Sequence, residues 1–144
     1  MKAASVLFSL TLLVATLYAQ QKDNQAAVPT VPYCDLFRET STSANSRLIR
    51  TYATWHYGFE WTFLLDDACP DLRAWVEFAS EDQRCAATAK NLKKLGHKDV
   101  NKPATVTMVG HLRGGGGNSG GYEYTFVVTC LESFKTISRW KLDP

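Results

Sequence analysis

Alternation of apolar and polar residues, which is typical of a half-buried β-strand, recurs five times along the chain. The alternating segments are residues 47–56, 59–66, 73–79, 104–112 and 122–130. In the first, Trp55 falls on the apolar face and Tyr52 on the opposite face, so Tyr52 should point outward. In the last, strict alternation places Phe126, Val128 and Cys130 together. Because the first three segments have short connections, we expect them to form an antiparallel meander.

The pattern changes to a helical period between the third and fourth of these segments. Ser80 followed by Gln83 fits a capping box at the start of a helix, and Lys93 and Lys94 suit its C-terminal end. A narrow apolar stripe runs along this helix, formed by Cys85, Ala89, Leu92 and Leu95. We expect the helix to pack on the strands through that stripe.

The order of elements is three strands, one helix and two strands, within about a hundred residues. This order predicts a mainly β fold, an OB-like five-stranded barrel over residues 34–142, with the helix closing one end. A closed barrel also removes the exposed edges that five short strands would otherwise present. The alternative is a small open sheet with one helix on it.

The N-terminal segment has the layout of a secretory signal peptide. Residues 1–19 carry Lys2, then an apolar run, then Ala19 before a polar stretch, and residues 20–33 read as a flexible leader. No later apolar run approaches the roughly 20 residues that span a bilayer, so we expect a secreted or periplasmic protein without a transmembrane segment. The formal net charge of +2, reduced by the loss of Lys2, argues against nucleic acid as a partner.

Four cysteines remain after signal cleavage: Cys34, Cys69, Cys85 and Cys130. An even number in an exported chain predicts two disulfides, for which three pairings are possible. We favour Cys69 with Cys85, which closes a short loop, and Cys34 with Cys130, which ties the start of the domain to its last strand. The spacings lack the close pairs of a zinc site, so we expect no metal.

Two long stretches also carry a resemblance to a known group of proteins. They are "CDLF…SRLIRTYATWHYGFEWTFLLDDACP…AWVEF" and "VTMVGHL…YTFVVTCLES". They resemble an uncharacterised family of small exported bacterial proteins, in which a Cys-x-Leu segment, a Gly-Phe-Glu turn and an Asp-x-x-Cys stretch follow in this order. The chain departs from that pattern at residues 45–47, where Asp-Gly-Lys is expected, and at Ala53, where glycine is expected. The resemblance implies an OB-like exported domain and no established activity.

A glycine-rich stretch, "GGGGNSGG" at residues 114–121, separates the last two strand segments. It lacks the lysine and the following helix of a phosphate-binding P-loop, so a nucleotide site is excluded. As a hairpin loop it is either a solvated tether or, since this loop of OB-folds flanks the ligand-binding face, part of a binding site.

Aromatic residues crowd the first three strand segments in greater number than one small barrel needs inside. Exposed rings next to basic side chains could stack on sugars or on a partner protein, whereas the alternative is that most of these rings form the core. The candidate binding residues are Arg50, Tyr52, His56, Tyr57, Trp61 and Arg113.

Carboxylates offer a weaker, catalytic alternative. Glu60 with Asp66 or Asp67 could act as acid and base in a small secreted hydrolase of phosphodiesterase type, with Arg50 and Arg113 over a phosphate. Adjacent acidic residues at the end of a strand more often form a solvated turn.

Three hypotheses for the function follow. The first is an exported, non-enzymatic binding or envelope-associated module for a glycan or protein, with no cofactor. The second is the small hydrolase. The third is a structural or stress-tolerance domain without a small ligand.

Overall fold

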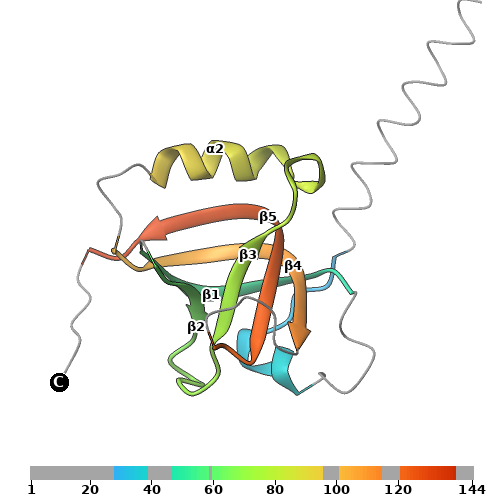
Figure 1. Cartoon of the computed structure of the whole chain (residues 1–144), viewed down its shortest axis with the longest axis vertical. Helices are drawn as coiled ribbons and strands as arrows, with labels where there is room; N and C mark the ends of the chain where they lie inside the picture. Colours follow the sequence, from blue (N-terminus) through green and yellow to red (C-terminus); the bar gives the residue numbers. More distant parts are fainter. Residues whose placement is uncertain (1–27, 39–46, 59, 96–100, 115–120, 139–144) are drawn as a thin grey trace, which may run out of the picture.

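A closed five-stranded barrel forms the body of the protein in the computed structural model shown in Figure 1. The structure describes residues 28–38, 47–58, 60–95, 101–114 and 121–138. The predicted signal peptide, most of the predicted leader and glycine-loop residues 115–120 lie outside them. The strands are β1 (Ile49–Tyr57), β2 (Thr62–Leu65), β3 (Ala74–Phe78), β4 (Ala104–Gly114) and β5 (Tyr124–Thr136).

The strand order around the barrel is β1-β2-β3-β5-β4, with β4 pairing back onto β1. All neighbouring strands are antiparallel except β3 and β5, which run parallel and close the barrel. An α-helix, α2 (Ala86–Leu95), lies between β3 and β4 in the chain. The OB-like barrel is therefore confirmed, and the open sheet is excluded.

Alternation along β1 determines which side chains reach the barrel interior. Ile49, Thr51 and Trp55 are buried, whereas Tyr52 is 54% exposed, as the sequence pattern predicts. The core is completed by apolar residues from the other strands, chiefly Leu64, Val76, Val106, Met108, Leu112, Phe126, Val128 and Leu131.

Two bulges in β5 break the predicted alternation. Val109 pairs with Cys130 and Gly110 pairs with Val128, so Thr129 is an extra residue in β5. Thr107 pairs with Ser133 and Met108 pairs with Leu131, so Glu132 is a second extra residue. A bulge shifts the following side chains to the other face of the sheet. Leu131 therefore enters the core, and the prediction that Cys130 continues the face of Phe126 and Val128 is wrong.

The helix begins later than its sequence pattern indicates. Residues Glu81–Gln83 form a separate 3-10 turn, η3, and the Ser80 side chain makes no capping hydrogen bond. Arg84 then takes an extended conformation, and α2 starts at Ala86. The buried face of α2 is formed by Thr88, Asn91 and Leu95, while Ala89 of the predicted stripe is exposed.

Two of the buried residues of α2, Thr88 and Asn91, are polar because they hydrogen-bond to the backbone of β5. β3 pairs with β5 only as far as Val128, so the next backbone groups of β5 would be an open edge. Thr88 Oγ1 accepts a hydrogen bond from Leu131 N at 2.9 Å. Asn91 Nδ2 donates to the carbonyl oxygens of Leu131 and Glu132 at 2.8 and 3.1 Å. We call the contacts of residues 85–91 with β5 residues 129–132 the α2 seam.

Both disulfides differ from the pairing that we favoured on sequence. Cys34 bonds to Cys69, and Cys85 bonds to Cys130 within the α2 seam. Cys69 precedes β3 and Cys85 follows it, and five strand residues alone span about 16 Å. Bonded cysteines have Cα atoms about 5.5 Å apart. Cys69 meets this distance with Cys34, at 5.9 Å, and Cys85 meets it with Cys130, at 5.1 Å.

The N-terminal part of the domain closes the other end of the barrel (Figure 1), where η1 (Tyr33–Phe37) lies opposite α2. Tyr33 is buried, and its hydroxyl donates to Leu64 O at 2.8 Å and accepts from Ala74 N at 3.1 Å. Residues 28–33, which we assigned to the leader, contact the barrel, since Val31 N donates to Arg50 O at 2.9 Å.

Among the residues that the structure describes, none of the helices has the length and apolar character needed to cross a membrane.

Candidate functional site: an aromatic face on the barrel

Three ring-bearing side chains lie next to one another on the outer surface of β1, β2 and β3. His56 pairs in register with Phe63, and Phe63 pairs with Trp75, so the three are direct cross-strand neighbours. They point outward because the residues next to them, Trp55, Leu64 and Ala74 among others, fill the core. The His56 and Phe63 rings are stacked, with centroids 4.9 Å apart and 5° between their planes.

Two further rings extend this row. Tyr122, just before β5, lies 5.8 Å from Phe63 and 5.6 Å from Trp75 between ring centroids. Trp61, in the connection between β1 and β2, lies 6.0 Å from Phe63 and is 37% exposed. We call these five residues the aromatic face.

Gly58 is needed where Trp61 folds back over the connection between β1 and β2. A Cβ atom on Gly58 would lie 2.6 Å from the Trp61 ring, closer than real Cβ contacts. The Gly58 N also donates to Trp61 O at 2.7 Å, so the turn is closed at this residue. Gly58 thus allows Trp61 to take its position on the aromatic face.

An exposed cation stands beside the rings. The Arg73 guanidinium lies 5.4 Å from the centre of the Phe63 ring, a cation–π distance. Arg73 makes no ion pair with any residue in the described part of the chain. Burial, and secondarily the charge of Arg73, lowers the pKa of His56, so this imidazole is neutral near pH 7.

A small hollow of about 190 Å³ adjoins the rings. Asp71 and Arg73 line it from the segment before β3, and Tyr122 and Glu123 line it from the segment before β5. Asp71 and Glu123 accept no hydrogen bond from any described residue, and both are exposed. Aromatic rings, a free cation and two free carboxylates are therefore brought together at one place.

Two of the predicted binding residues, His56 and Trp61, belong to the aromatic face. Tyr57 does not, because it is 9% exposed and packs on Trp55 inside the barrel, with ring centroids 4.7 Å apart. Tyr52 lies four residues from His56 along β1, about 13 Å away.

Tyr52 instead lines a separate hollow of about 480 Å³ together with Asp66, Asp67 and Lys135. This hollow is larger than the one beside Tyr122, but two aromatic residues line it, the exposed Tyr52 and the partly buried Phe134, against five in the aromatic face. Two of the hydroxyl groups that line this hollow are bonded to each other, since Ser133 Oγ donates a hydrogen bond to Thr107 Oγ1 at 3.0 Å. We therefore place the candidate site at the aromatic face.

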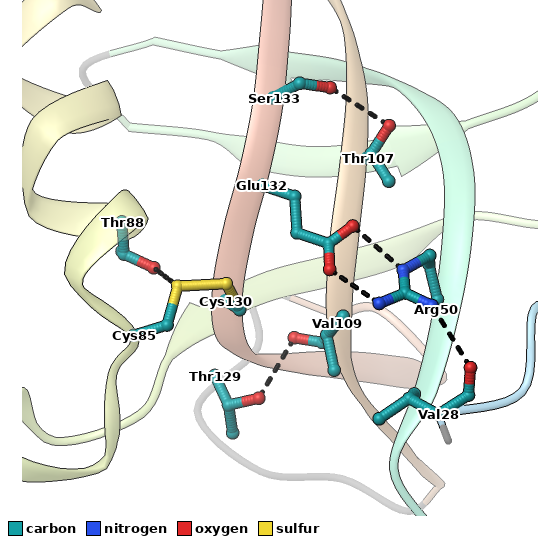
Figure 2. Close-up of polar contacts among 10 residues, drawn as sticks. All are labelled: Val28, Arg50, Cys85, Thr88, Thr107, Val109, Thr129, Cys130, Glu132 and Ser133. Carbon is teal, nitrogen blue, oxygen red and sulfur yellow. Dashed lines mark hydrogen bonds and ion pairs between the residues drawn. A yellow bond between two sulfur atoms is a disulfide. The ribbon is translucent and has the colours of Figure 1, made fainter. Parts of the chain in front are cut away.

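Arg50 is part of the polar network shown in Figure 2. Its guanidinium donates to both carboxylate oxygens of Glu132, at 2.9 and 2.8 Å, and to Val28 O at 3.1 Å. The bulge at Glu132 aims that carboxylate outward across β4 to reach Arg50. Arg50 thus joins β1 to β5 beside the Cys85–Cys130 disulfide, away from the rings.

Arg113 is also paired. It forms an exposed ion pair with Glu77 at 2.8 Å, on the outer surface of β3, β5 and β4. His111 lies nearby, and burial followed by the charge of Arg113 lowers the pKa of its imidazole.

The three carboxylates of the hydrolase hypothesis are split between the two ends of β2. Glu60 precedes the strand, whereas Asp66 and Asp67 follow it, and four strand residues span about 13 Å. Asp66 Oδ1 accepts a hydrogen bond from Ala68 N at 2.8 Å, and Asp66 O accepts one from Cys69 N at 3.0 Å. These are the contacts of a turn.

Four residues of this region are not among the binding residues predicted from the sequence: Phe63, Arg73, Trp75 and Tyr122. Phe63 and Trp75 could have been predicted from the sequence, since alternation along the strand places Phe63 on the face opposite to the buried Leu64. Arg73 and Tyr122 were not, because both lie just outside strands and only the fold brings them beside Phe63.

Comparison of the chain with models of protein families, with curated proteins and with solved structures finds no match, so the argument for function depends on the residues themselves.

Proposed function

We propose that this protein is an exported, non-catalytic binding module that holds a glycan against its aromatic face. The observation that carries the proposal is the row of rings across three adjacent strands, continued by Trp61 and Tyr122. The C–H groups on a sugar ring's face pack against the face of an aromatic ring, and its hydroxyls take hydrogen bonds at the edges. The outer surface of these strands is also where OB-folds hold oligosaccharides.

The energetics of the aromatic face favour binding over a purely structural role. A core aromatic residue buries nearly all of its surface, as Trp55 does at 4% exposure. His56, Phe63, Trp75 and Tyr122 keep part of their surface in water, and Trp61 keeps more than a third. Covering this remaining apolar surface with a ligand is favourable by about 25 cal/mol per Å².

The placement of the carboxylates supports a binding module over a hydrolase. Glu60 and Asp66 lie at opposite ends of β2, whereas the two carboxylates that act together in glycoside hydrolases, for example, are about 5 to 10 Å apart. The two disulfides support export, because such bonds persist in oxidising compartments outside the cytosol.

The proposal is tested by titrating the mature, oxidised protein with soluble glucan, mannan and xylan oligosaccharides and recording tryptophan fluorescence and heat of binding. Trp61 and Trp75 lie in the aromatic face, so we expect a saturable change in fluorescence. Trp61→Ala should weaken binding about tenfold or more, since stacking one ring contributes on the order of 1 to 3 kcal/mol.

Tyr52→Ala is the matched control. Tyr52 is more exposed than Trp61 and lies on the same outer surface, but it belongs to the other hollow. Its removal should leave affinity unchanged. Equal losses in both variants, or no binding by the wild type, would contradict the proposal.

A further inference from the structure

The hollow beside Tyr122 differs in chemistry from the rings that it adjoins. Its charged lining is Asp71, Arg73 and Glu123, two carboxylates and one guanidinium, so its local charge is negative. None of the three is used in an ion pair within the described ranges. In the free protein these groups are exposed, and water occupies their hydrogen-bonding capacity.

We infer that this hollow is the subsite for one sugar unit that carries no negative charge, so that the ligand is a neutral glycan. The inference rests on the proposed function and names its substrate class. The Tyr122 ring forms the wall on which the sugar ring stacks. Asp71 and Glu123 accept hydrogen bonds from the hydroxyl groups of the sugar, and Arg73 donates hydrogen bonds to those hydroxyl groups.

The size of the hollow fits one sugar ring. A volume of 190 Å³ corresponds to about six water molecules at roughly 30 Å³ each. Pockets for whole drug-sized ligands start near 300 Å³. One ring therefore fills the hollow, and the remainder of a glycan chain continues toward Trp61, the most exposed ring of the aromatic face.

The charge of the hollow determines which sugars it accepts. A carboxylate accepts two hydroxyl hydrogen bonds with good geometry, and hydrogen bonds to charged groups are the stronger ones. A uronic acid or a sulfated sugar would bring a negative charge against Asp71 and Glu123, with only Arg73 to offset it. A calcium ion is also disfavoured, because it requires six to eight oxygen ligands and would face Arg73.

A printed array that carries neutral and acidic oligosaccharides side by side tests the inference with the mature, oxidised protein. We expect binding to neutral members only. Asp71→Asn and Glu123→Gln should each weaken that binding about tenfold, because the amide loses acceptor strength. Both side chains are exposed, so thermal unfolding should be unchanged. Asp82→Asn, on the exposed η3 turn, is the control of equal charge change.

The direction of the change distinguishes the alternatives. If the ligand is acidic, removing a carboxylate removes repulsion, so Asp71→Asn and Glu123→Gln would strengthen binding, and binding to acidic members would overturn the inference. Neutral binding that is unchanged in both variants and in Tyr122→Ala would overturn it as well, while leaving the aromatic face as the binding surface. Absence of binding to every glycan would overturn the proposed function together with the inference.

Discussion

Two regions on the outside of the same barrel use their polar groups in opposite ways. In the α2 seam, Thr88 and Asn91 are hydrogen-bonded to the backbone of β5. In the neighbouring pair, Arg50 and Glu132 are bonded to each other (Figure 2). Beside the aromatic face, the charged groups Asp71, Arg73 and Glu123 form no ion pair in the described part of the chain, and the neighbouring rings keep surface in water.

This difference separates stability from recognition. Groups already hydrogen-bonded within the chain lower the free energy of the folded state and offer nothing to a ligand. Groups left to water, held on rigid strands, lose little freedom when a ligand replaces that water. Substitutions in the α2 seam should therefore change stability alone, and substitutions of Trp61 and of the charged groups beside the aromatic face should change binding alone.

Removal of the Cys85–Cys130 disulfide should give the largest effect. The bond closes a separation of 45 residues, for which the chain-entropy model gives about 4 kcal/mol. Cys85→Ala with Cys130→Ala should lower the free energy of unfolding by about that amount in urea denaturation, while glycan affinity stays the same at temperatures where the variant is folded. A large loss of glycan affinity in the folded variant would contradict the division between the α2 seam and the aromatic face.

Loss of the Asn91 amide should have the next largest effect. Asn91→Leu leaves the carbonyl oxygens of Leu131 and Glu132 without this donor, and a buried unsatisfied group costs about 1 to 3 kcal/mol. We expect a decrease of about 2 kcal/mol in unfolding free energy, measured against Lys90→Leu on the exposed side of α2. Equal effects of the two substitutions would show that the amide does not protect the edge of β5.

A pair of arginines gives the most closely matched comparison. Arg50→Gln breaks a bidentate ion pair and should destabilise the protein by about 1 kcal/mol without changing affinity. Arg73→Gln should leave stability within about 0.5 kcal/mol and weaken glycan binding. Chemical denaturation and calorimetric titration of both variants measure the two effects. The opposite assignment of effects would contradict the division between the two regions.

The smallest effect concerns pH. The pKa of His56 is lowered in the folded protein, mainly by burial, from an ordinary value of 6.5. As the pH falls below about 6.5, His56 is protonated in the unfolded chain before it is protonated in the folded protein. The free energy of unfolding should therefore decrease until the folded His56 is protonated too. His56→Gln should flatten the fall in stability below about pH 6.5, and His111→Gln should flatten it further. An unchanged slope would show that neither imidazole is held neutral.

The fold was predictable from the sequence because alternation and element order are local signals. Trp55 and Tyr52 lie on the sides that their positions predict, and the helix falls between the third and fourth strands. The β5 bulges were not predictable, because they depend on register with β4. One extra residue at Thr129 turns Cys130 outward to Cys85, and the disulfide prediction failed with it.

The candidate site was predictable only in part for a similar reason. His56 and Trp61 could be selected as exposed rings close to basic residues, whereas Tyr57 could not be recognised as part of the core. Arg73 and Tyr122 are separated by almost 50 positions and meet across β3 and β5. The parallel pairing of β3 with β5 creates the hollow between them, and pairing of distant strands has no local signal.

The most direct test of the central claim, that a neutral glycan lies on the aromatic face, is a map of backbone amide shifts by NMR during titration with neutral glucan and mannan oligosaccharides. We predict saturable shifts confined to residues 56, 61–63, 71–75 and 121–124, with the α2 seam unchanged. Saturable shifts centred on the α2 seam or on the hollow at Tyr52, or the absence of any saturable shift, would contradict the account.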